Sequence, residues 1–166
     1  MKKLFLMLLT VLMTFVASVS FAAPIQPNQL TVKGLSMSSS MEQVEQVMGK
    51  PYRIGHYYME SYWGGYNDIM YEYPGVNFVF KTGYGATSHP MLKIILDAPQ
   101  VSLDNGLKVG IPLGTVAQTL GTDYKFINGE VVYDCIIDPV TYETGKFTFI
   151  VEGKTVTKIL IEKQKG

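Results

Sequence analysis

An internal repeat constrains the fold of this chain more than any other feature of its sequence. The stretch GLSMSSSMEQVEQVMGKPY (residues 34–52) aligns without gaps on GLKVGIPLGTVAQTLGTDY (residues 106–124). A repeated sequence of this length predicts a repeated supersecondary unit, whose copies bury their apolar faces together. We therefore predict two copies, repeat 1 over residues 23–97 and repeat 2 over residues 98–166.

A short helix is predicted at the start of each copy, over about residues 39–48 and about residues 112–120. In both segments apolar side chains recur with the spacing of one helical face, and a glycine follows where the helix must stop. Ser39 and Glu42 also stand at the spacing of a capping box, which would satisfy free N–H groups of the first turn. The apolar positions and terminating glycines are Met41, Val44, Met48 and Gly49 in repeat 1, and Leu113, Val116, Leu120 and Gly121 in repeat 2.

Four strands are predicted after each helix. Turn-forming pairs such as Pro74-Gly75 and Asn128-Gly129 separate runs of β-forming residues, and Asn-Gly is the strongest short hairpin signal. A helix followed by antiparallel strands is an α+β pattern, so we expect a curved sheet of about eight strands with both helices on one side. The expected strands are residues 52–63, 66–73, 76–80, 91–96, 124–127, 130–137, 146–151 and 155–162.

The first 22 residues have the composition of a signal peptide. A basic start is followed by an apolar stretch over residues 4–19, and Ser20-Phe21-Ala22 supplies a small-x-small cleavage site. An uncleaved membrane anchor is the alternative, because residues 4–23 could just span a bilayer. The small-residue end and the lack of a basic stop-transfer flank favour cleavage. We predict an exported protein, periplasmic or secreted, that meets the membrane only through this segment.

Charge and cysteine usage exclude several classes of protein. Loss of Lys2 and Lys3 with the signal peptide turns a chain of 14 basic and 14 acidic residues slightly acidic. The single arginine, Arg53, and scattered lysines form no basic stripe, so nucleic acid is not an expected partner. Cys135 is the only cysteine, so no intramolecular disulfide can form. Its apolar neighbours predict a buried small hydrophobe.

No catalytic constellation is apparent in the sequence. His56 and His89 have no histidine at the spacing of a zinc site, and Cys135 has no Cys-x-x-Cys partner. Nucleophile-elbow, phosphate-loop and dinucleotide motifs are absent. Asp134 and Asp138 are better explained as a solvated strand residue and a turn-starting aspartate than as a catalytic pair. We therefore predict a non-enzymatic protein with no catalytic residues, no metal and no cofactor.

Aromatic residues are concentrated in HYYMESYWGGYNDIMYEYPG, residues 56–75, which holds six of the eleven tyrosines and the only tryptophan. Tyrosine and tryptophan suit partner recognition, but cross-strand aromatic pairs also stabilise hairpins without a ligand. Repeat 2 builds its corresponding hairpin, DYKFINGEVVYDC, with far fewer aromatics, which favours recognition. Another exposed aromatic is expected in the insertion of residues 81–90. The candidate binding residues are Tyr57, Tyr58, Tyr62, Trp63, Tyr66 and Tyr84.

The helix-start motif is similar to one found in two related groups of proteins. The run GIPLGTV (residues 110–116), closing at Gly121, resembles the motif of the β-lactamase inhibitor protein family and of the small lipoprotein subunit of the outer-membrane β-barrel assembly machinery. Repeat 1 keeps the spacing, with Ser38 where the motif has glycine. The resemblance implies helix-plus-sheet repeats that bind proteins without catalysis, through a concave aromatic-rich sheet in the inhibitor. This chain lacks the lipid-anchor cysteine of one group and the disulfides of the other.

These observations lead to two functional hypotheses. The first is an exported, non-catalytic protein-binding module, inhibitor-like or associated with the cell envelope, that uses an aromatic-rich sheet face. The alternative is a cell-wall or carbohydrate binder, in which Trp63 and the tyrosines stack on sugar rings.

Overall fold

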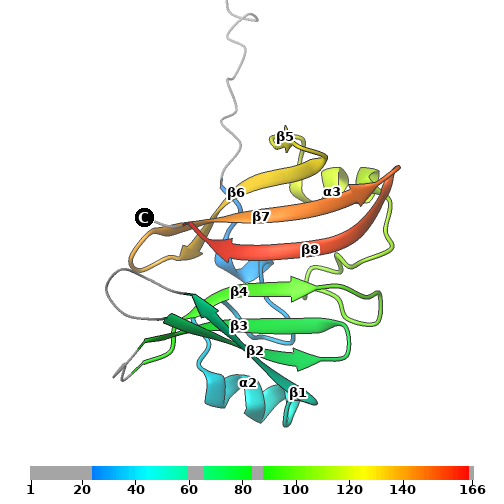
Figure 1. The fold of residues 1–166 in the computed structure, drawn as a ribbon. Coiled ribbons are helices and arrows are strands. Elements are labelled where there is room, and N and C mark those ends of the chain that lie inside the picture. The colour runs from blue at the N-terminus through cyan, green and yellow to red at the C-terminus, as the bar shows by residue number, and fades with distance from the viewer. Residues whose placement is uncertain (1–23, 60–65, 84–87, 165–166) are drawn as a thin grey trace, which may run out of the picture.

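The computed structural model describes residues 24–59, 66–83 and 88–164, and for residues 57–59, 66–67 and 83 it describes only the backbone. Two α-helices and eight strands occur in this part of the chain (Figure 1). In chain order the elements are η1 (Pro27–Gln29), α2 (Met41–Met48), β1 (Arg53–Met59), β2 (Tyr66–Tyr73), β3 (Val76–Gly83), β4 (Met91–Leu96), α3 (Leu113–Leu120), β5 (Lys125–Ile127), β6 (Glu130–Asp138), β7 (Glu143–Glu152) and β8 (Thr155–Lys163).

All eight strands belong to one sheet with the order β1-β2-β3-β4-β8-β7-β6-β5. Every neighbouring pair is antiparallel. The order is that of two four-stranded meanders joined through their last strands, where Ile94 of β4 is paired with Ile161 of β8. The predicted α+β class, with one antiparallel sheet and two short helices, is confirmed.

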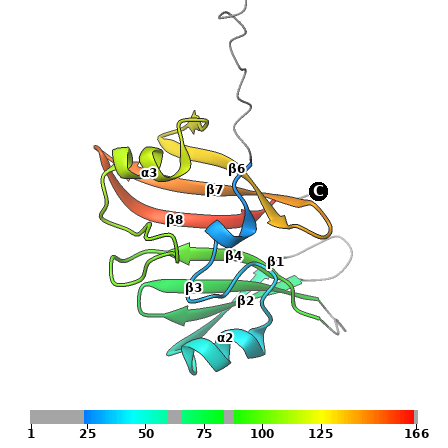
Figure 2. The ribbon, with the colours of Figure 1, turned by 180° about the vertical axis from the view of Figure 1, so that it is seen from behind.

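Both helices and the segment that begins with η1 lie on the same side of the sheet (Figure 2). The core forms between this layer and the sheet face beneath it. Burying a large apolar side chain contributes roughly 1.5–3 kcal/mol, so the paired aromatic strands are a main source of stability. Cys135, 2% exposed, belongs to this core, as the sequence predicts. The largest fully buried side chains include Phe78, Phe80, Phe147, Phe149, Leu30, Ile94, Leu96, Ile159 and Ile161.

The start of α2 differs from the prediction. Ser40, not Ser39, is the N-cap: its Oγ accepts from the Gln43 N–H at 3.2 Å, while Gln43 Oε1 accepts from the Ser40 N–H at 2.8 Å. Ser39 is unavailable because its Oγ accepts the Ser36 N–H at 3.0 Å. The reciprocal pair with Gln43 therefore begins the helix at Met41, two residues later than predicted. At the start of α3, Pro112 is the N-cap and not a first-turn residue.

The ends of the two helices are held to the sheet in the same way. The Tyr73 O–H of β2 donates to the Gly49 carbonyl at 2.8 Å, and the Tyr133 O–H of β6 donates to the Gly121 carbonyl at 2.8 Å. Both glycines follow the last helical residue with positive φ, +82° and +87°, a conformation that favours glycine. Each helix is thus fixed to the second strand of its own meander.

Strand boundaries differ from prediction mainly at β7. The segment 138–145 was expected to be a loop, but β7 starts at Glu143 and pairs Gly145 with Cys135. A Cβ at Gly145 would collide with the Ile137 side chain and the Glu162 carbonyl, so glycine permits this close approach. β3 also runs beyond Phe80, to Gly83. Residues 60–63 of the expected first strand lie outside the described residues.

Candidate binding face of the sheet

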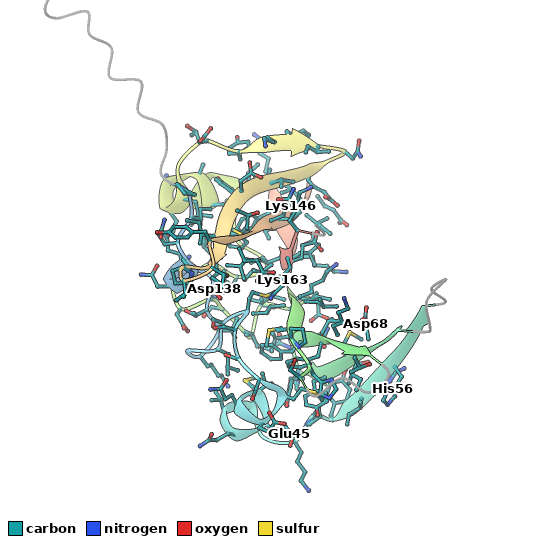
Figure 3. The ribbon with its side chains drawn as sticks, turned by 90° about the vertical axis from the view of Figure 1, so that its left-hand side faces the viewer. Glu45, His56, Asp68, Asp138, Lys146 and Lys163 are labelled. Carbon is teal, nitrogen blue, oxygen red and sulfur yellow. The ribbon has the colours of Figure 1, made fainter. Side chains whose placement is uncertain are left out.

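The sheet face opposite the helices carries the candidate site, and we call it the open face. It is the front of Figure 1, and Figure 3 views it edge-on, with Lys146 and Asp68 on the side away from the helices. Because side chains alternate along each strand, the residues on this face follow from the register of the paired strands.

A row of mainly apolar side chains crosses the middle of the open face. Ile95, Leu160, Thr148 and Val132 are successive cross-strand partners on β4, β8, β7 and β6. Ile95 and Leu160 are half-buried, while Thr148 and Val132 are 3% and 5% exposed. We call these four residues the apolar row. The accessible surface of this row therefore comes mainly from Ile95 and Leu160.

Charged side chains alternate in sign in the next row, Lys93, Glu162, Lys146 and Asp134, again as cross-strand partners. Lys93 Nζ lies 2.6 Å from Glu162 Oε2, and Lys125 Nζ lies 2.7 Å from Asp134 Oδ2. The hydrogen bond to Asp134 raises the pKa of Lys125. Among the described residues Lys146 makes no ion pair. This charged row is therefore nearly neutralised, and it leaves one free cation.

Glu72 of β2 lies on the open-face side of its strand, yet it is only 8% exposed. The Tyr52 O–H donates to Glu72 Oε2 at 3.1 Å, and Arg53 Nε lies 3.6 Å from Glu72 Oε1. The hydrogen bond to Glu72 raises the pKa of Tyr52. A buried carboxylate is tolerable here because it is paired.

The register divides the predicted binding tyrosines between the two faces. Position 57 is paired with Asp68, and position 66 is paired with position 59, which puts Tyr57 and Tyr66 at open-face positions. Tyr58 is paired with Asn67, on the side that also holds Tyr71 and Tyr73 of the core. Tyr62, Trp63 and Tyr84 lie outside the described residues. The structure thus brings two of the six candidate positions onto one face with the apolar row.

Several connections leave the sheet at one end, on the left of Figure 1. At this end β1 ends and β2 begins, and β3 ends and β4 begins. The turn between β6 and β7 lies at the same end. The sequence prediction missed the two side chains that this last turn presents, Val140 at 84% exposure and Tyr142 at 75%. Apolar residues directly after the turn-starting Asp138-Pro139 were the available signal.

Described residues line pockets at two places. One of about 370 Å³ lies at the start of α2, where Ser38, Glu42, His89 and Lys163 contribute polar groups. The other, of about 320 Å³, lies at the β5 edge of the sheet. No group of three or more metal-ligating side chains occurs among the described residues. Burial raises the pKa of Cys135 to about 12, so its thiol is a poor nucleophile.

Within the described part of the chain, no helix has the length and apolarity needed to cross a membrane.

Comparisons with known proteins give a weak fold likeness and no family. No family model matches the chain, and no curated protein matches it significantly. One similar solved structure is an extracellular protein containing a SCP domain from Bacillus anthracis str. Ames, with a TM-score of 0.45 and 10% identity over 77% of this chain and 44% of that one. Another is the uncharacterized protein yfeY from Escherichia coli, with a TM-score of 0.41 and 12% identity over 85% of this chain and 100% of that one.

The chain thus spans less than half the length of the first of these structures. Both TM-scores lie below 0.5, so neither likeness bears on function. Membership of the inhibitor-like or assembly-lipoprotein-like groups stays a prediction from the repeat motif.

Proposed function

We propose that this chain is an exported, non-catalytic protein-binding module built from two tandem helix-plus-meander repeats, and that it binds its partner through the open face. The symmetrical strand order and the two equivalent tyrosine–glycine hydrogen bonds, at Gly49 and Gly121, support the repeat. The signal-like composition of residues 1–22 supports export.

The composition of the open face carries the proposal. Ile95 and Leu160 of the apolar row supply accessible hydrophobic area, and the adjacent charged row is largely paired within the protein. Burying a charge that keeps its partner costs less than burying a lone one. By strand register, positions 57 and 66 belong to the same side of the sheet as these rows. An apolar centre with a polar surround is the usual anatomy of a protein–protein contact.

The partner is a protein with an apolar patch and a carboxylate positioned for Lys146. An inhibitor-like role and a role in the cell envelope both fit such a partner. Nothing among the described residues favours the glycan alternative, because Trp63, its main stacking platform, lies outside them. That alternative therefore enters as an outcome of the experiment.

The test is site-specific photo-cross-linking in the organism that produces the protein. A photo-reactive residue replaces Lys146, whose side chain is exposed and makes no ion pair among the described residues; the control replaces Lys50, also exposed, at the end of α2. We expect a protein adduct from position 146 and none from position 50. The captured protein is then purified and titrated with wild type and Leu160→Asp, and the substitution should weaken binding at least tenfold.

Two results would overturn the proposal. One is equal affinity of wild type and Leu160→Asp for every captured protein. The other is the lack of any protein adduct, together with a saturable change in tryptophan fluorescence on titration with peptidoglycan fragments, which would favour the glycan binder.

A further inference from the structure

The turn between β6 and β7 presents the two most exposed large apolar side chains among the described residues. Val140 is 84% exposed and Tyr142 is 75% exposed. At the corresponding place in the first meander, β2 and β3 are joined by Pro74-Gly75, which presents no such side chain. The larger turn is therefore not needed to connect the strands.

Hydrogen bonds fix the shape of this turn. Asp138 Oδ1 accepts the Val140 N–H at 2.7 Å and the Thr141 N–H at 3.3 Å. The Val140 N–H lowers the pKa of the Asp138 carboxyl, so the carboxylate is ionised at neutral pH. Immediately after the turn, Lys163 Nζ lies 2.9 Å from Glu143 Oε2. The turn is thus held in one conformation at both ends.

The backbone of Tyr142 is held in an unfavourable conformation. Its φ is +55°, in the left-handed region that aromatic residues rarely adopt. Such strain persists only where the surroundings impose it, and it is concentrated at sites of function. Glycine would relieve it. A tyrosine in this backbone conformation, with a side chain that is 75% exposed, fits a role in contact with a partner.

Charge and size decide which kind of partner suits this turn. Two side chains are too little for membrane binding, because even a myristoyl chain gives only marginal affinity, with a binding constant on the order of 10⁴ M⁻¹. The Asp138 carboxylate would also be repelled by anionic lipid. A preformed protein pocket can enclose both side chains, and a basic rim would add to the attraction that Lys163 already exerts on the Asp138 carboxylate.

We propose that Val140 and Tyr142 are anchor residues that enter an apolar pocket with a basic rim on a protein partner. This inference rests on the proposed protein-binding function but assigns a different surface, the end of the sheet instead of its open face. The fixed turn reduces the entropy that binding would otherwise cost.

The test compares the double variant Val140→Ser/Tyr142→Ser with the control Phe126→Ser, whose side chain on β5 is also exposed, at 66%. A photo-reactive residue at position 142 captures the partner, which is purified and titrated with each form. We expect at least a tenfold loss of affinity in the double variant and less than a twofold change in the control. Circular dichroism and urea unfolding should be the same for all three, because the substituted side chains are exposed.

The outcomes separate this inference from the proposed function. A partner that binds the double variant as tightly as wild type, yet is lost with Leu160→Asp, overturns the anchor role and leaves the open-face function standing. Capture of no protein from position 142 or position 146 overturns both. Vesicles of about three parts phosphatidylcholine to one part anionic phosphatidylglycerol test for a membrane. Binding to these vesicles that the double variant abolishes overturns the protein partner in favour of a membrane.

Discussion

Removing the hydroxyl of Tyr73 or of Tyr133 should destabilise the protein by nearly the same amount. In each case the phenol donates to the carbonyl of the glycine that ends a helix, at 2.8 Å, and the tyrosine is 4% or 2% exposed. Substitution by phenylalanine keeps the ring and its packing. It deletes only the hydrogen bond between helix and sheet.

The size of the destabilisation depends on whether the glycine carbonyl finds another hydrogen-bond donor once the tyrosine hydroxyl is removed. A net hydrogen bond contributes roughly 0.5–1.5 kcal/mol, and a buried group left without a partner costs about 1–3 kcal/mol. Gly49 and Gly121 are exposed residues, so water can replace the phenol at their carbonyls. We therefore expect about 1 kcal/mol for each single variant. The two sites lie five strand spacings apart, about 24 Å, so the double variant should lose about 2 kcal/mol.

Urea unfolding of Tyr73→Phe, Tyr133→Phe, the double variant and the control Tyr142→Phe measures these losses. For a protein of this size each single change should lower the midpoint by roughly 0.5 M, with an unchanged slope. The control should have no effect, since the Tyr142 side chain is exposed. If one site costs more than twice the other, or if neither midpoint moves, then the two helix ends are not equivalent and the argument from the repeat fails.

The same variants make a prediction about alkaline pH. Burial raises the pKa of Tyr73 and of Tyr133 to about 12 in the folded state, against about 10 in the unfolded chain. Between these values the unfolded state binds fewer protons, so stability is complete below pH 10 and falls as pH rises toward 12. Each tyrosine contributes at most about 1.4 kcal/mol per pH unit. The double variant should lose stability less steeply over this range, and an equal slope would contradict the assigned burial.

Three further substitutions or treatments follow from individual contacts. Asp104→Ala removes the carboxylate that accepts the backbone N–H groups of Lys33 and Gly34, each at 2.9 Å, and it should lower the free energy of unfolding in urea at pH 7 by about 1–3 kcal/mol. Burial opposes ionisation, but hydrogen bonding holds the pKa of Asp104 below its usual value, so the difference from wild type should shrink as pH falls through this lowered pKa. A difference that stays constant down to pH 2 would refute this. Gly145→Ala should destabilise the protein by about 1–3 kcal/mol or prevent folding, because the new methyl group would collide with the Ile137 side chain. A normal melting temperature would show that β7 does not approach Ile137 so closely. Cys135 should resist a thiol reagent at pH 8 until urea unfolds the protein, since it is buried and its pKa is raised to about 12; rapid native-state labelling would disprove that placement.

Local chemistry in the sequence determined most of the elements. Glycines with positive φ end both helices, turn-forming pairs separate the strands, and the apolar neighbours of Cys135 identify it as a core residue. These features depend on the conformational range of one residue or on the period of a short segment. They can therefore be read without knowing which segments meet.

The tertiary structure decided what the sequence left open. The joining of the meanders through β4 and β8, the burial of Glu72 beside Arg53 and Tyr52, and the choice of Ser40 as N-cap each depend on neighbours supplied by folding. The same holds for the open face. Alternation along a strand separates two sets of side chains, but only the docking of the helices decides which set is covered and which one faces a partner.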